Sequence, residues 1–311
     1  MLGDRGQTLS AEPGLRASPA TAEPYGPLVS ICIPTCNGEA YLDDALTSAM
    51  RQTYRNLEIV VSDDASADAT LRIARSYQAE SAIPFHIFEH VPSGIGANWN
   101  SCARRANGTY IKFLFQDDRL APDCVAKMVA LAERDERIGL VFCRRKIIVE
   151  QESGFTEQWI RKFSVLHTAW PGLEEINSGR RLLKRCARLL KHPSNKVGEP
   201  IAVLLRAAAL RRVDYFNEGL EQLLDIELWY RIFFRYKVGF IDEELAAFRL
   251  QQDQASQKNQ GRVAHERDVL EDLMYRELFW ALHRDVQLAL FRKKSRVYRW
   301  WRRLGKRPTF G

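Results

Sequence analysis

The chain of 311 residues has the composition of a folded globular protein, with 46% hydrophobic and 27% charged residues. Enough apolar side chains are present to bury a core, which excludes an intrinsically disordered protein. The longest apolar runs have the length of a strand and fall short of the roughly 20 residues that cross a bilayer, which excludes an integral membrane protein. The net charge of +7 belongs to the end of the chain, because residues 284–311 carry ten Lys and Arg against Asp285 alone.

Residues 1–26 are rich in Ala, Gly, Pro and Thr and lack the basic start and apolar core of a secretory signal, so we expect a flexible tail there. The six cysteines are scattered without a CxxC pair and lie mostly in apolar segments, which favours free buried thiols over a zinc site. Free thiols are typical of a reducing compartment, so we expect a cytoplasmic protein.

In the first half of the chain, apolar runs of strand length alternate with segments of helical period. The pattern predicts strands at 28–33, 57–61, 85–88, 110–115 and 138–143. They are separated by helices at 42–50, 68–77 and 122–134 and by a loop leading into a helix at 94–106. Such alternation is typical of an α/β fold, with a mostly parallel, Rossmann-like sheet flanked by helices.

Beyond residue 150 the alternation breaks, although single elements are still predicted. The pattern indicates a basic amphipathic helix at 181–191, a strand at 201–205, a helix at 225–236, two short strands within 238–250, and helices from 262 onward.

Two pairs of aspartates follow strands of the predicted sheet, at the edge where parallel sheets bind ligands. Asp63 and Asp64 follow one strand, and Asp117 and Asp118 follow another. Adjacent carboxylates repel each other unless a cation offsets the charge, and Mg²⁺ combines few carboxylates with water and phosphate oxygens. Each pair alone is also typical of a turn or a helix cap. Together they predict a nucleoside at one end and a metal-bound diphosphate at the other, with a third acid, Asp225, near a helix start further on.

Five segments carry a family resemblance in the same order along the chain. They are residues 29–42, 52–68, 94–100, 108–118 and 224–231. These segments resemble family 2 glycosyltransferases, which have the GT-A fold, and the likeness extends over residues 27–255. It implies one catalytic domain at 27–255, followed by a helical, basic and aromatic extension at 256–311.

The resemblance assigns roles by position. It implies a nucleotide-sugar site formed by Pro34, Thr35, Glu39, Asp63, Asp64, Asn98 and Asp117. Among these, Asp64 with Asp63 contacts the base, whereas a helix start explains Asn98 equally well. Asp117 falls at the last acid of the family's DXD signature, so Asp117 and Asp118 are the expected ligands of Mg²⁺ or Mn²⁺. Asp225 is the expected general base.

The implied function is metal-dependent, inverting transfer of a sugar from a UDP- or dTDP-sugar to a hydroxyl of a glycan or lipid-linked acceptor, in the synthesis of cell-surface polysaccharide. Phe115 stands where the family has the first DXD acid, and Leu224 stands where it has the Glu of a Glu-Asp pair. These two departures keep an alternative open, a catalytically inactive, membrane-associated nucleotide- or glycan-binding module of the same fold.

Aromatic residues lie between the cationic residues at the end of the chain, at Phe291, Tyr298, Trp300 and Trp301. Such a segment favours contact with an anionic membrane surface, here the cytoplasmic face, through aromatic and basic side chains. A solvated helix packed on the catalytic domain is the second interpretation. Contact with nucleic acid is the third, and we expect no nucleic acid partner, because the remainder of the chain is slightly acidic.

Overall fold

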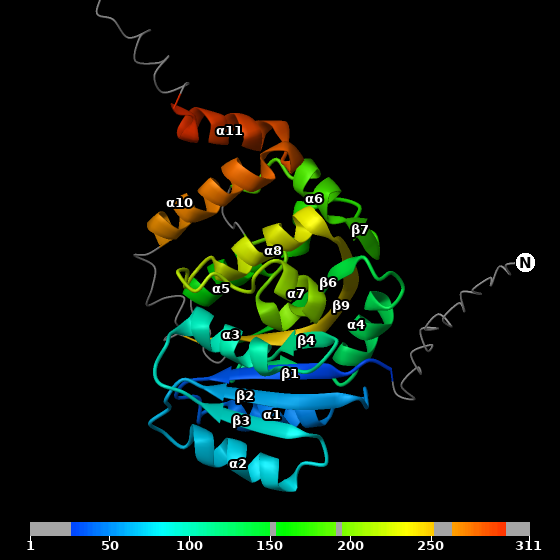
Figure 1. Ribbon diagram of the computed structural model, residues 1–311, viewed down its shortest axis with the longest axis vertical. Coiled ribbons are helices and arrows are strands. Elements are labelled where there is room, and N and C mark those ends of the chain that lie inside the picture. Colours follow the sequence, from blue (N-terminus) through cyan, green and yellow to red (C-terminus); the bar gives the residue numbers. More distant parts are fainter. Residues whose placement is uncertain (1–25, 150–153, 191–194, 252–262, 297–311) are drawn as a thin grey trace, which may run out of the picture.

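The computed structural model describes residues 26–149, 154–190, 195–251 and 263–296 (Figure 1). A nine-stranded sheet has the order β3-β2-β1-β4-β8-β6-β9-β5, and β7 pairs with β9. The strands are β1 (Val29–Thr35), β2 (Leu57–Asp63), β3 (Phe85–Glu89), β4 (Tyr110–Phe113), β5 (Arg119–Leu120), β6 (Ile138–Val149), β7 (Ile176–Ser178), β8 (Val203–Arg206) and β9 (Lys237–Leu250).

The direction of the strands changes across the sheet. β1 pairs in parallel with β2 and β4, and β2 pairs in parallel with β3. From β8 onward the pairing is mixed, since β8 is antiparallel to both of its neighbours whereas β6 and β9 are parallel. The predicted α/β sheet flanked by helices is confirmed, and the uninterrupted parallel pairing belongs to its N-terminal half.

Helices cover both faces of the sheet. They are α1 (Leu42–Met50), α2 (Thr70–Glu80), α3 (Ile95–Arg105), α4 (Cys124–Ala132), α5 (Gly154–Phe163), α6 (Gly179–Arg185), α7 (Ala207–Arg212) and α8 (Leu224–Arg235), with short 3-10 turns at Leu166–Ala169 and Pro200–Ala202. Side chains alternate along a strand, so Ile31 and Ile33 join one apolar cluster with α1 and α4, whereas Cys32 joins another with α3, α7 and α8. All six cysteines are free, and five are buried while Cys36 is exposed.

The C-terminal helices share the second of these cores. They comprise α10 (Val263–Leu273), a π-helical turn η4 (Met274–Leu278), a 3-10 turn η5 (Phe279–Ala281) and α11 (Arg284–Lys294). Leu270, Met274 and Leu290 are buried with residues of α6 and α8, and Figure 1 shows α10 and α11 at the end of the molecule opposite α2. Within the described ranges, no helix is both long and apolar enough to cross a bilayer.

Two predicted elements differ from the structure. The segment expected to form two short strands is one strand, β9, because the acidic residues 242–244 are accommodated by an irregularity opposite Cys143 and Arg144 rather than by a turn. The helix expected at 181–191 is the shorter α6, which ends before the extended residue Cys186. The expected tail at 1–26 and the aromatic residues Tyr298, Trp300 and Trp301 lie outside the described residues, apart from Gly26.

Candidate active site

The loop after β1 is tied to the start of α2. Pro34 and Thr35 are buried at the end of β1, and Glu39 lies exposed in the turn that follows. The Glu39 carboxylate accepts a hydrogen bond from the Ala69 amide (2.8 Å), while the Glu39 amide donates to Asp68 Oδ2 (3.0 Å). The loop is therefore held in one conformation by partners about 30 residues further along the chain.

Asp63 is fully buried at the end of β2 and joins the two loops. Its Oδ1 accepts hydrogen bonds from the hydroxyls of Thr35 (2.7 Å) and Ser66 (2.6 Å), and its Oδ2 accepts from the Ser66 amide (2.8 Å). The carboxylate is thus occupied within the protein, where three donors stabilise it.

Asp64, the next residue, lies against the loop before α3. Its Oδ1 accepts from the Ser93 amide (2.7 Å) and its Oδ2 from the Gly94 amide (3.2 Å). His90 Nδ1 lies 3.4 Å from the same carboxylate. Asp64 and the loop at 90–94 therefore form one unit beside the end of β2.

Asn98 is buried in the first turns of α3 and fastens that helix to the sheet. Its Nδ2 donates to the Thr35 carbonyl (3.0 Å), and its Oδ1 lies 3.2 Å from His90 Nε2. The side chain of Asn98 thus links Thr35 at the end of β1 to His90 in the loop before α3.

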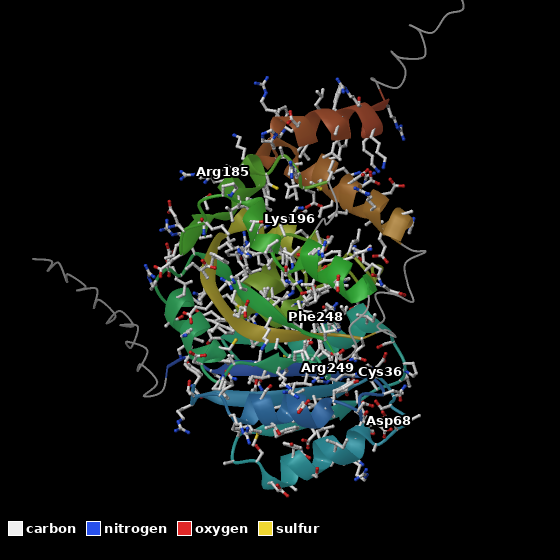
Figure 2. All side chains as sticks on the ribbon, turned by 180° about the vertical axis from the view of Figure 1, so that it is seen from behind. Cys36, Asp68, Arg185, Lys196, Phe248 and Arg249 are labelled. Atoms are coloured by element: carbon white, nitrogen blue, oxygen red, sulfur yellow. The ribbon has the colours of Figure 1, made fainter. Side chains whose placement is uncertain are left out.

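Asp117 and Asp118 follow β4 and differ in exposure. Asp117 is half-buried, and its Oδ2 accepts from Gln251 Nε2 (2.8 Å). Asp118 is fully buried, and its Oδ1 accepts from the Arg249 amide of β9 (2.8 Å). Burial raises the pKa of Asp117 to about 6, and burial together with the Asp117 charge raises the pKa of Asp118 well above its ordinary value. Figure 2 shows Arg249, Phe248, Cys36 and Asp68 on one side of the molecule.

These two carboxyl groups fit a divalent cation that takes its other ligands from a substrate. Asp118 Oδ2 is buried and has no hydrogen-bond partner among the described residues. A bound cation would therefore stabilise the ionised form of the Asp117–Asp118 pair. No group of three or more His, Cys, Asp and Glu side chains that could hold a metal occurs in the described part of the chain. The donor set therefore suits Mg²⁺ or Mn²⁺ held jointly with phosphate oxygens and water.

Asp225 lies at the start of α8, where 8% of its surface is exposed. Its Oδ1 accepts from the Ile226 amide (2.6 Å) and its Oδ2 from Asn195 Nδ2 (2.8 Å). Burial and the nearby Glu199 carboxylate raise the pKa of Asp225 to about 8. A carboxyl group with this pKa can exchange a proton near neutral pH, as a general base requires.

Glu199 connects the two acidic regions. Its charge raises the pKa of both Asp225 and Asp118, so its carboxylate lies within electrostatic reach of each. Arg145 of β6 forms a buried ion pair with Glu199 and donates from Nη2 to its Oε1 (3.1 Å). The predicted base Asp225 and Asp118, one of the two predicted metal ligands, therefore both lie within electrostatic reach of one carboxylate.

Phe115, at the position of the first DXD acid, belongs to an aromatic cluster. Its ring centroid lies 4.7 Å from that of Trp99 and 6.4 Å from that of Phe113. Phe216 packs edge-on against both Trp99 (5.2 Å) and Phe113 (5.5 Å). The position thus contributes packing, with no polar atom for a ligand.

Residues 30–217 of the chain match the family described as Glycosyl transferase family 2. The chain belongs to glycosyltransferase family 2. It is 29% identical over 237 residues to the uncharacterized glycosyltransferase RC0461 of Rickettsia conorii, a match that covers 75% of this chain and 36% of that relative. The chain thus spans about a third of the length of this relative.

Solved structures share the fold of this family 2 member. The Staphylococcus aureus TarS fragment 1–349 in complex with UDP-GlcNAc has a TM-score of 0.64 at 18% identity, covering 87% of this chain and 74% of that one. The mannosyltransferase PcManGT of Pyrobaculum calidifontis in complex with GDP-Man and Mn²⁺ has a TM-score of 0.56 at 16% identity, covering 94% and 83%. These neighbours are GT-A glycosyltransferases, so the family 2 chain has the GT-A fold.

Several residues of this family 2 site escaped the sequence analysis. Asn195 and Arg145 received no role, because their partners lie 30 and 54 residues away and no local pattern marks them. The family resemblance puts Glu199 and Arg249 where relatives shape the acceptor side, a position that loop or sheet-edge structure also explains. Gln251 bonds Asp117, although its neutral side chain gave no signal of a metal site.

Proposed function

We propose that this glycosyltransferase moves a sugar from a nucleoside diphosphate to a hydroxyl of a glycan or lipid-linked acceptor, with inversion at the anomeric carbon. The observation that carries the proposal is a series of contacts between Asp118 and Asp225. The Arg249 amide bonds Asp118, and the ring of the adjacent Phe248 lies 5.9 Å from the Arg145 guanidinium. Arg145 in turn pairs with Glu199, which follows the turn whose Asn195 donates to Asp225. A metal-and-phosphate position and a base are both needed for a direct displacement, and Asp118 and Asp225 lie at the two ends of this series of contacts.

The chemical step is a single displacement. The acceptor oxygen attacks the anomeric carbon, the bond from that carbon to the diphosphate oxygen breaks, and the diphosphate leaves with the electron pair. Asp225 in its ionised form takes the acceptor's hydroxyl proton, and its two donors hold its oxygens in place. Attack opposite the leaving group inverts the configuration, which requires one base and no covalent intermediate on the protein.

The donor would bind along the loops after β1, β2 and β4. We propose that Pro34, Thr35 and Glu39 shape the nucleotide pocket and that Asp64 contacts the base, for which its bonds to Ser93 and Gly94 must open or be shared. Asp63 and Asn98, which bond Thr35 directly, would act mainly by fixing that wall. The TarS complex with UDP-GlcNAc supports a UDP-sugar as the donor to test first, with dTDP-sugars next.

A divalent cation fits at Asp117, with Asp118 buried behind it. Such a cation, when bound, offsets the negative charge that develops on the departing diphosphate. Asp117 is the more exposed carboxylate and would supply the direct ligand, while Gln251 orients it. Asp118 is fixed by the Arg249 amide and would coordinate only if its Oδ2 turned toward the cation. The Mn²⁺ in the PcManGT complex supports this choice of metal class.

We further propose a role in cell-surface polysaccharide synthesis at the cytoplasmic face of a membrane, and exposed side chains of the C-terminal helices support this part of the proposal. Three apolar side chains are exposed there, Trp280 (83%), Leu288 (49%) and Phe291 (39%). Lys293 and Lys294 are largely neutralised by Asp268, Glu271 and Asp272, which leaves the arginines of α11 for anionic headgroups. Sedimentation should show binding to phosphatidylglycerol vesicles that weakens in Trp280→Ser and Leu288→Ser, whereas equal binding to phosphatidylcholine vesicles would contradict it.

The experiment that tests the function is a screen of nucleoside diphosphates and their sugars by thermal shift and calorimetry, with and without Mg²⁺ or Mn²⁺. We expect one nucleotide to stabilise the protein strongly only with metal, and its sugar derivative to be transferred or slowly hydrolysed. Metal-dependent binding without any turnover would instead support the inactive binding module, which Phe115 and its packing against Trp99 favour.

A further inference from the structure

Asn195 begins a tight turn whose hydrogen bonds fix the direction of its side-chain amide. Its Oδ1 accepts from the amides of Val197 (3.0 Å) and Gly198 (2.9 Å), and its Nδ2 donates to the Gly198 carbonyl (3.0 Å). Because two backbone donors point at one atom, that atom must be the oxygen. The group directed at Asp225 Oδ2, 2.8 Å away, is therefore an N–H donor.

The turn is fastened to the same helix that carries Asp225. Trp229 of α8 is fully buried and donates from Nε1 to the Gly198 carbonyl (3.1 Å). Asn195 thus reaches Asp225 from a loop that α8 itself anchors four residues further on. Motion of the amide relative to the carboxylate is limited by this closed arrangement.

The charged and titratable groups around Asp225 come from three places. Glu199 follows the turn, Arg145 lies on β6, and Tyr230 lies on α8 itself, with the Glu199 charge raising and the Arg145 charge lowering the pKa of Asp225. Among the described residues, Asn195 is the side chain that donates to Asp225, beside the Ile226 amide. Each carboxylate oxygen of Asp225 thus accepts one hydrogen bond from these two residues and retains a lone pair that can accept a proton.

We propose that Asn195 is a positioning residue for Asp225, whose N–H fixes the rotation of the carboxylate and favours its ionised form for proton transfer. This inference rests on the proposed role of Asp225 as the base. It assigns a function to the turn at 195–198 and predicts that the amide nitrogen, rather than the size of the side chain, is what the reaction requires.

The test compares Asn195→Asp with the wild type. Aspartate keeps an oxygen for Val197 and Gly198 but replaces the donor with a second carboxyl oxygen. We expect kcat at pH 7 to fall at least 10-fold and the pH midpoint of kcat/KM to rise by about one unit, because a donor to the ionised form is lost. The affinity for the nucleotide-sugar substrate should change by less than twofold. The matched control is Asn217→Asp, since Asn217 Oδ1 also accepts a backbone N–H two residues on.

A second variant and a second readout cover the other outcomes. Asn195→Ser can still accept from Val197 but is too short to reach Asp225, so it replaces Asn195→Asp if that variant unfolds. Asp225→Asn is introduced into both the wild type and the Asn195 variant, and the unfolding free energy of each pair is measured against pH. The difference within a pair reports the titration of Asp225 without any substrate. The inference is overturned if the pH midpoint does not move, or if the only loss is in affinity for the nucleotide-sugar substrate. Full activity in Asp225→Asn would instead overturn the proposed base.

Discussion

The aspartates at the two ends of this site are held in opposite ways. Asp63 and Asp64, in the parallel half of the sheet, each accept hydrogen bonds from several donors. Asp118 and Asp225, beside the mixed half, are buried with few donors and with Glu199 nearby, which raises the pKa of both. The same side chain is thus a structural anchor in one region and a group poised for a proton or a cation in the other.

The number of hydrogen-bond donors around each carboxyl group indicates which of them can take part in the reaction. A carboxylate satisfied by hydroxyls and amides has little to gain from a further ligand, whereas a buried carboxyl without matched donors favours any cation or proton that reaches it.

The largest expected effect is on kcat in Asp225→Asn. The amide keeps the shape of the side chain but cannot take a proton, so transfer should fall by about 10²- to 10⁴-fold while donor binding is retained. Steady-state kinetics beside calorimetry would separate the two quantities. Asp285→Asn on α11, where the carboxylate is exposed, is the matched control and should behave as the wild type.

Next is the loss of metal-dependent binding in Asp117→Asn. Removing the more exposed carboxylate should reduce kcat/KM about 100-fold or more and abolish the gain in nucleoside diphosphate affinity from Mn²⁺. Titrations with and without Mn²⁺ measure this directly. Asp123→Asn, close in sequence and exposed before α4, provides the comparison, and equal metal dependence in both variants would refute the assignment.

A third effect concerns stability and pH. The pKa of Asp225 is raised to about 8 in the folded protein, so folding favours its protonated form, and stability is lost as pH rises from about 4 through 8. Asp225→Asn should therefore be more stable than the wild type by a few kcal/mol at pH 9 and nearly equal to it at pH 4. Chemical denaturation at the two pH values gives the difference, and a gap that does not vary with pH would speak against the buried, protonated carboxyl.

The smallest effect is expected at Gly38, in the well-satisfied region. An added Cβ there would clash with Gln116 Oε1 and displace the side chain that bonds the Cys36 amide (2.8 Å) and carbonyl (3.1 Å). Gly38→Ala should lower the unfolding free energy by about 1–2 kcal/mol and raise the KM for the donor modestly. Because Gln116→Ala removes the same bonds, the double variant should be little worse than either single one. Additive losses would mean that Gln116 is not the link.

The N-terminal half of the fold follows from local patterns in the sequence. The apolar runs that end near Pro34 and Val61 predicted β1 and β2 to within two residues, since buried parallel strands are continuous and their helices show one apolar face. The course of β9 was not predictable, because an irregularity against β6 absorbs its acidic residues and depends on that partner strand.

The acidic residues of the candidate site could be predicted from the sequence, whereas the residues that hydrogen-bond or pair with them could not. Asp63 and Asp64 look alike along the chain, and only the fold shows that the first is enclosed by Thr35 and Ser66. The Asn195 amide and the Arg145–Glu199 pair act through contacts between distant segments, which no local spacing encodes.

We propose that Asp225 takes the acceptor's proton in a single displacement at the anomeric carbon. The most direct measurement is the anomeric configuration of the first product, determined by proton NMR from the coupling at the transferred sugar before any mutarotation. We predict a product of configuration opposite to that of the donor. A product with the donor's configuration retained would contradict this account.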